Sequence, residues 1–119
     1  MRTTTGIVHR SPSACWTVLT DPSTLTGWMP GLRKARVLDR YPTGLAKEIE
    51  LEFASAAYSQ LYTYDVASHE VRWKPARGTS NAGFAKLEPF EDGSRLTYGL
   101  EGADPDPLVK QFVTWMHAY

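Results

Sequence analysis

Apolar and polar residues alternate from Leu45 to Phe53, and this is the strongest periodic pattern in the chain. Ile49 and Leu51 share one phase with the terminal phenylalanine, and three glutamates occupy the other phase. Successive side chains of a β-strand point to opposite faces, so a period of two predicts a strand with one dry face and one solvated face. Such a strand is typical of an antiparallel sheet.

Six further segments have strand character, because they contain β-branched, aromatic or alternating residues bounded by turn residues. Gly83 lies inside one of them and predicts a bulge or a sharp bend at that point. Asp92-Gly93 predicts a tight hairpin before the last strand. The six segments are Thr3–His9, Lys34–Asp39, Tyr58–Val66, Val71–Pro75, Gly78–Leu87 and Arg95–Glu101.

Two short helices are predicted directly after the first strand. Ser11-Pro12 supplies a hydroxyl N-cap followed by proline at the first helical position, and Asp21-Pro22 repeats this signal. The first helix is expected to end near Thr20 and the second near Thr26. An apolar loop containing Trp28 then leads to the next strand.

The final segment, Leu108–Tyr119, predicts an amphipathic helix. Its apolar residues recur every three or four positions and form a broad stripe that includes Phe112 and Met116. Because this pattern still runs at Tyr119, the natural chain can extend beyond that residue.

The order of these elements predicts the fold class. Strands and helices do not alternate after residue 30, which argues against a doubly wound α/β fold. We therefore expect an α+β fold in a single domain spanning residues 1–119. One curved antiparallel sheet of about six or seven strands would wrap around the C-terminal helix.

Composition narrows the partners and the compartment. The chain has 119 residues, with 42% hydrophobic and 22% charged residues, which suits one folded domain. Thirteen basic and thirteen acidic residues cancel without a basic run, so a nucleic-acid partner is not expected. A single cysteine, no signal-peptide pattern and no apolar run near the roughly 20 residues of a membrane span predict a cytoplasmic protein.

One family resemblance covers nearly the whole chain. The segment Cys15–Pro22, followed by Trp28-Met29-Pro30, resembles the opening of START-like proteins, also called the SRPBCC superfamily. That group includes the polyketide cyclase/dehydrase-like proteins. The segment Ala85–Tyr98 looks like the last hairpin of the family.

The resemblance implies a helix-grip fold, in which a curved sheet grips a long C-terminal helix with an apolar cavity between them. It also implies a small hydrophobic ligand, of a lipid, polyketide or quinone-like kind. The final helix of this chain has room for only about 12–15 residues, which is shorter than is typical of the family. We therefore expect an incomplete cover over the cavity, or one that a partner completes in a homodimer.

Nine side chains form the candidate ligand-binding set, because they lie on the inward strand phases, on the final helix or in the apolar loop. Ligand pockets combine mostly apolar walls with a few polar groups, and Tyr and Trp provide both. For any single one of Tyr62, Tyr64 and Trp73, ordinary aromatic packing across strands is the favoured explanation. The set is Trp28, Ile49, Leu51, Tyr62, Tyr64, Trp73, Tyr98, Phe112 and Met116.

Three functions are compatible with this pattern. The leading hypothesis is a binding protein for a small hydrophobic molecule. The first alternative is an enzyme of the polyketide cyclase/dehydratase type, which would need an acid/base pair facing the pocket. His69 suits acid/base work by residue type but falls at a predicted turn. The second alternative is an interaction module without a pocket, or a dimer, because four Trp, six Tyr and four Phe could fill the interior.

The residue pattern predicts neither a metal nor a cofactor. The three histidines and the single cysteine lack the spacing of a metal site. The glycine-containing stretch 78–83 lacks the lysine and the following helix that a phosphate-binding loop needs. Whether the protein catalyses any reaction is left open by the sequence.

Overall fold

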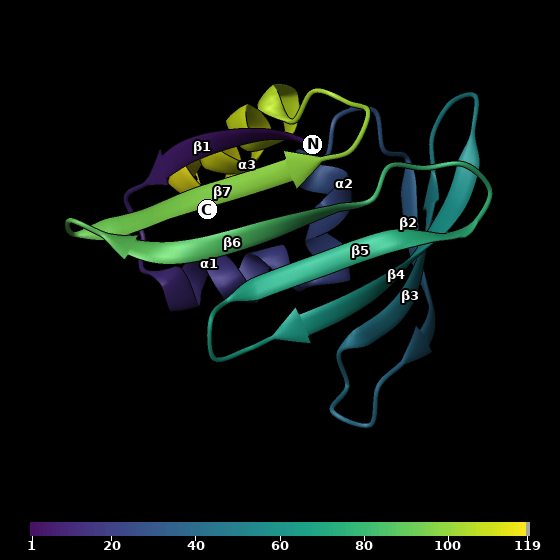
Figure 1. The fold of residues 1–119 in the computed structure, drawn as a ribbon, viewed down its shortest axis with the longest axis horizontal. Coiled ribbons are helices and arrows are strands. Elements are labelled where there is room, and N and C mark those ends of the chain that lie inside the picture. Colours follow the sequence, from purple (N-terminus) through teal and green to yellow (C-terminus); the bar gives the residue numbers. More distant parts are fainter. Residues whose placement is uncertain (119) are drawn as a thin grey trace.

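The computed structural model describes residues 1–118, which form one antiparallel sheet with helices packed on one of its faces (Figure 1). Tyr119, the last residue of the predicted helical stripe, lies outside the described residues. The elements are β1 (Arg2–Val8), α1 (Pro12–Leu19), η1 (Pro22–Thr24), α2 (Leu25–Trp28), β2 (Lys34–Arg40), β3 (Ala46–Glu52), β4 (Ala57–Asp65), β5 (Glu70–Arg77), β6 (Gly83–Phe90), β7 (Gly93–Leu100) and α3 (Asp106–Ala118).

The sheet has seven strands within residues 1–118, in the order β1-β7-β6-β5-β4-β3-β2. Every neighbouring pair is antiparallel, and β1 and β2 form the two edges. The chain passes through the helical segment after β1, and the strands from β2 to β7 then follow one another as neighbours, so that β7 meets β1. This confirms the predicted α+β helix-grip fold with a curved sheet.

The predicted caps start the first two helical segments. Ser11 accepts a hydrogen bond through Oγ from the backbone N–H of Ala14 at 3.1 Å. Asp21 accepts one through Oδ1 from the backbone N–H of Ser23 at 3.0 Å. Each cap satisfies a backbone donor that the helix itself leaves free, which stabilises the helix start.

The second helical segment runs further than predicted. It begins as the 3₁₀ turn η1 and continues as α2 to Trp28, so this tryptophan ends a helix and does not lie in a loop. Gly27 is expected to end this helix but lies inside α2, and the ring of Trp115 packs against it. A Cβ at this position would overlap that ring.

The strand predicted over residues 78–87 begins only at Gly83. Gly78 has φ +77°, a left-handed conformation that ends β5, and residues 78–82 form a loop. Of the two alternatives predicted at Gly83, a bulge or a sharp bend, the bulge is wrong, because the pairs with Trp73 and Leu100 at the ends of the two ladders are in register with the rest. Gly83 is instead a point of close approach, where a Cβ would overlap the carbonyl oxygen of Gly99.

Helix α3 lies over the β1 edge of the sheet (Figure 1). Gly6 of β1 has no side chain, and a Cβ there would lie 2.7 Å from Cγ1 of Val109 and 3.0 Å from Cγ2 of Val113. The helix can therefore approach this strand closely. Phe112 and Met116 on its inner face are fully buried. None of the helices in residues 1–118 is long and apolar enough to cross a membrane.

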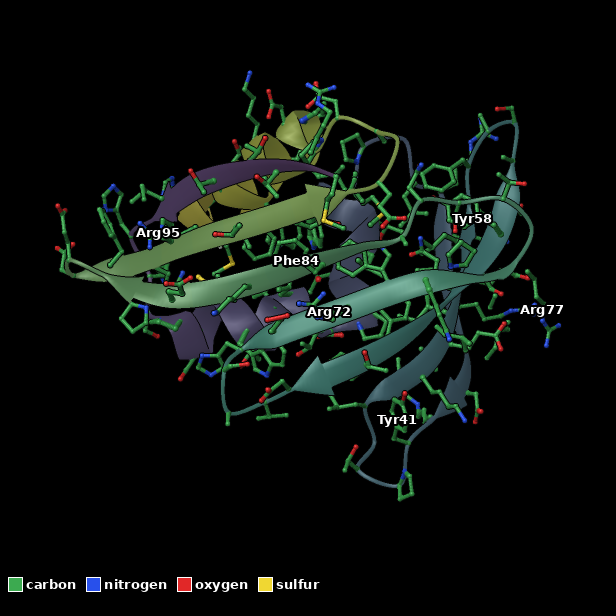
Figure 2. The ribbon with its side chains drawn as sticks, in the orientation of Figure 1. Tyr41, Tyr58, Arg72, Arg77, Phe84 and Arg95 are labelled. Carbon is green, nitrogen blue, oxygen red and sulfur yellow. The ribbon has the colours of Figure 1, made fainter. Side chains whose placement is uncertain are left out.

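The opposite face of the sheet is polar and charged. Figure 2 shows Arg72, Phe84 and Arg95 on this face, away from the helices. The guanidinium of Arg72 lies 5.4 Å from the ring centroid of Phe84, and that of Arg95 lies 5.4 Å from that of Phe90. Arg95 also pairs with Glu88 at 3.4 Å. The sheet therefore has one dry face and one solvated face, as the alternating pattern predicts.

Candidate functional site

A cavity of about 260 Å³ lies between the inner face of the sheet and the segment that runs from the end of α1 to the loop after α2. Strands β3, β4, β5 and β7 form one wall. Helix α3 contributes only Pro107 and Leu108, from its first turn. The cavity opens near Pro30, Asn81 and Asp104, whose side chains are exposed.

Most of the predicted ligand-binding set lines this cavity. The two members on α3, Phe112 and Met116, are fully buried but are not part of the wall. The reason is that α3 packs over β1, so that α2 forms the side of the cavity opposite the sheet. The set members that line the cavity are Trp28, Ile49, Leu51, Tyr62, Tyr64, Trp73 and Tyr98.

Trp28 separates the cavity from the core beneath α3. Its exposed fraction is 3%, and its ring meets that of Phe112 edge-on with centroids 5.1 Å apart. Its indole N–H donates to Oγ1 of Thr24 at 3.3 Å. Trp28 therefore both packs in the core and lines the cavity.

Sequence reasoning missed part of the wall. Phe53, Val71 and Leu100 continue the inward phases of their strands, so the period-two pattern could have identified them. Asn81 and Ala103 come from loops, where no periodicity marks which side chains turn inward. Their place in the wall depends on the tertiary arrangement of the β5–β6 and β7–α3 connections at the open end of the cavity.

Most polar groups of the wall already bond to one another or to the backbone. The Tyr62 hydroxyl donates to Oε1 of Gln60 at 2.8 Å, and Nε2 of Gln60 donates to the carbonyl of Asn81 at 3.4 Å. The Tyr64 hydroxyl donates to the carbonyl of Ala46 at 2.7 Å. These bonds fix the orientation of two tyrosine rings in the wall.

Burial keeps the tyrosines of the wall protonated. It raises the pKa of Tyr98 and of Tyr58, and it raises the pKa of Tyr62 well above its ordinary value. For Tyr62, the nearby Tyr98, Tyr64 and Tyr58 add to the effect. Burial, with a smaller contribution from Tyr41, raises the pKa of Tyr64 to about 12. At neutral pH these phenols can donate hydrogen bonds but cannot act as bases.

Charged groups are scarce in the wall. Among residues 1–118, the wall contains no histidine, lysine, arginine or cysteine, and its carboxylate, that of Asp104, is exposed and lies 3.5 Å from Arg2. His69 lies at the β4–β5 turn, where its ring is 5.5 Å from that of Trp16, and it is not part of the wall. Within the described residues, no three His, Cys, Asp or Glu side chains gather as a metal site.

Stability is expected to fall as the pH rises above about 10, where tyrosines of an unfolded chain ionise. In the folded protein the buried phenols keep their protons to higher pH, and the pKa of Tyr64 is about 12. Between these values the unfolded state binds fewer protons than the folded state. The contribution of these tyrosines to the free energy of unfolding is therefore constant below pH ~10 and is lost as the pH rises toward 12. Thermal unfolding at a series of alkaline pH values measures this loss.

The Tyr64→Phe variant is the control for this pH effect. It lacks one of the raised phenols, so its melting temperature should fall less steeply over the same pH range. A melting temperature that stays constant through this range in the unaltered protein would contradict the expectation, as would ionisation of every tyrosine near pH 10 in an ultraviolet titration.

Comparisons with known proteins agree with this architecture. The model of the family described as polyketide cyclase / dehydrase and lipid transport matches residues 8–115. A search among curated protein sequences found no match.

Solved structures also share the fold. A START superfamily protein of Mycobacterium smegmatis is similar with a TM-score of 0.74 and 17% identity, over 98% of this chain and 88% of that chain. A protein of Thermus thermophilus has a TM-score of 0.77 and 12% identity, over 98% and 96%. The Zhui aromatase/cyclase of Streptomyces sp. R1128 has a TM-score of 0.67 and 14% identity, over 98% and 81%. At these identities the likeness concerns the fold.

Proposed function

Because the chain belongs to the polyketide cyclase / dehydrase and lipid transport family, we propose that it binds a small hydrophobic molecule in the cavity between the sheet and α2. The observation that carries this proposal is the cavity itself. Its volume of about 260 Å³ lies just below the roughly 300–1,000 Å³ that is usual for ligand pockets. The cavity argues against the predicted interaction module without a pocket.

The chemistry of the wall supports binding by apolar contact. Ile49, Leu51 and Val71 are almost fully buried and present aliphatic side chains to the cavity, and Trp28 and Trp73 present aromatic rings. A ligand that covers these groups removes apolar surface from water, which is the main source of affinity in such sites.

The side chains of the wall support ligand binding better than they support catalysis. A cyclase of the type considered above needs two titratable groups whose environments push their pKa values apart. The wall offers protonated tyrosines and one exposed carboxylate among the described residues. The predicted homodimer and the cytoplasmic location stay predictions.

Filling the cavity is expected to weaken binding at least about tenfold, because a larger side chain occupies the space of the ligand. Leu51→Trp adds an indole at a wall position that is 1% exposed. The measurement is fluorescence titration with prodan, a neutral naphthyl ketone dye, together with native mass spectrometry. The matched control is Glu52→Trp, which places the same side chain on the solvated face of the same strand.

The outcome is read together with folding, measured by circular dichroism. A folded Leu51→Trp protein that binds prodan as tightly as the unaltered protein does would show that this cavity is not the binding site. If neither the unaltered protein nor the control shows saturable binding, the proposal is refuted. If Leu51→Trp does not fold, Ala103→Phe at the cavity mouth provides the same test, since Ala103 is half-buried and has more room to accept a ring.

A further inference from the structure

One buried hydroxyl group in the cavity wall has no hydrogen-bond partner among residues 1–118. Tyr98 of β7 is 4% exposed and lines the cavity, yet its phenol oxygen bonds to none of residues 1–118. The hydroxyls of Tyr62 and Tyr64 in the same wall are both bonded. Buried polar groups in folded proteins nearly always have partners, so an open donor facing a cavity indicates where a ligand atom sits.

A second open donor lies beside the first. The ring of Trp73 is 5.2 Å from that of Tyr98, and its indole N–H also bonds to none of the described residues. A tryptophan N–H can only donate, and the phenol of Tyr98 is protonated at neutral pH because its burial raises its pKa. This part of the wall therefore presents two hydrogen-bond donors, which a ligand atom that accepts hydrogen bonds can satisfy.

The acceptor belongs to a neutral molecule. The cationic side chains of residues 1–118 lie outside the wall, so a carboxylate or phosphate would lose its hydration in the cavity without gaining an opposite charge. Asp104 at the mouth would repel such an anion and is already paired with Arg2. A carbonyl oxygen accepts hydrogen bonds without carrying a charge.

The volume limits the size of the ligand. An apolar cavity of about 150 Å³ holds one benzene molecule. The cavity here is less than twice that size, at about 260 Å³. One ring, or two fused rings with small substituents, fits it, whereas a long acyl chain or a molecule of four fused rings exceeds it.

Building on the proposed function, we propose that the cavity binds a neutral one- or two-ring carbonyl compound whose oxygen accepts a hydrogen bond from the Tyr98 hydroxyl. The rings lie against Ile49, Leu51 and Trp28, and the carbonyl points toward β7. Tyr98 thereby selects carbonyl compounds over hydrocarbons of the same shape, with the N–H of Trp73 beside it as a second donor.

Two ligands that share a two-ring frame test this selection. 1-Tetralone carries one carbonyl oxygen, and tetralin lacks it. Tyr98→Phe removes only the hydroxyl, so it should weaken 1-tetralone binding about tenfold and change tetralin binding less than about twofold. Competition with prodan measures both affinities, and thermal unfolding checks each variant. Progesterone, a four-ring ketone, should bind the unaltered protein at least about tenfold more weakly than 1-tetralone.

The control is Tyr64→Phe, which removes a hydroxyl from the same wall. That hydroxyl already donates to Ala46, so its loss should change the affinities for the two ligands by the same factor. An equal effect of Tyr98→Phe on both ligands would overturn the proposed role of Tyr98, and would indicate that water satisfies its hydroxyl. Progesterone binding as tight as that of 1-tetralone would overturn the size limit.

The failure of this inference can be told apart from the failure of the proposed function. If both ligands bind and Tyr98→Phe weakens them equally, the cavity is still the binding site, and only the selective role of the Tyr98 hydroxyl is refuted. If the unaltered protein binds neither ligand, both the selective role of Tyr98 and the proposed binding function are refuted. If Tyr98→Phe does not fold, the infrared carbonyl band of 1-tetralone bound to the unaltered protein decides the matter. A band at lower wavenumber than in hexane supports the hydrogen bond, and an unshifted band overturns it.

Discussion

Replacing Phe112 with alanine is expected to lower the free energy of unfolding by about 3–5 kcal/mol. Phe112 is fully buried on α3, and its ring packs edge-on against that of Trp28 with centroids 5.1 Å apart. Truncation removes a large apolar side chain from the interior and leaves a void between α2 and α3, where the surrounding side chains cannot fully collapse. For a domain whose total stability is typically about 5–15 kcal/mol, such a loss is large.

Equilibrium unfolding in urea measures this change. The control is Gln111→Ala, the neighbouring residue on the exposed face of α3, which should stay within about 0.5 kcal/mol of the unaltered protein. A loss below about 1 kcal/mol for Phe112→Ala would show that this contact does not hold α3 in place.

Phe112→Leu separates the role of this residue in folding from a role in binding. The ring lies behind Trp28 and is not part of the cavity wall, so a smaller apolar side chain there should change ligand affinity much less than Leu51→Trp does. If prodan binding falls as far in Phe112→Leu as in Leu51→Trp, while the protein stays folded, the cavity reaches α3 and Phe112 contacts the ligand as the sequence predicts.

Gly83→Ala is expected to cost about 3 kcal/mol and to weaken ligand binding as well. A Cβ at this position would overlap the carbonyl oxygen of Gly99 and would lie 2.9 Å from Cζ2 of Trp73. The first contact is with the backbone of a strand that is paired on both sides, which cannot move without disturbing the pairing of β7 with β6 and β1. The second pushes the indole of Trp73 toward the cavity.

Gly6→Ala is the matched control for this prediction. Its Cβ would meet the side-chain methyl groups of Val109 and Val113, at 2.7 and 3.0 Å, and such groups can shift more easily than backbone. It also lies under α3, away from the cavity wall. We expect a smaller loss of stability than in Gly83→Ala and no effect on prodan affinity. Equal losses of stability in the two variants, measured by urea unfolding, would contradict the assignment of Gly83 to a point of close approach.

Local patterns were sufficient to predict the strands and their faces. Ile49, Leu51 and Tyr62 are buried on the inner face because period-two alternation dictates which side chains share a face. The same pattern fails at Lys47, which shares the phase of Ile49 but is exposed, while Ala46 is 1% exposed. The pairing of β2 with β3 shifts register at this end of the strands, and the shift reverses the phase.

Polar partners in the site could not be read from the chain. Tyr62, Tyr64 and Tyr98 look equivalent in sequence, since each is an inward tyrosine in a strand. In the structure the first two hydroxyls reach acceptors on the sheet, and the third reaches none among residues 1–118. The difference depends on which strands lie side by side and in which register, so the open donor became visible only in the folded molecule.

The sequence by itself determined the fold class, a sheet of about six or seven strands, the helix caps and most of the apolar faces, because these follow from backbone geometry within a few neighbouring residues. The tertiary structure alone decided where the apolar faces meet. The broad stripe of α3 could pack against any strand of the sheet, and the absence of a side chain at Gly6 allows it to approach β1 closely. That position places Phe112 in the core and leaves the space beside α2 as the cavity.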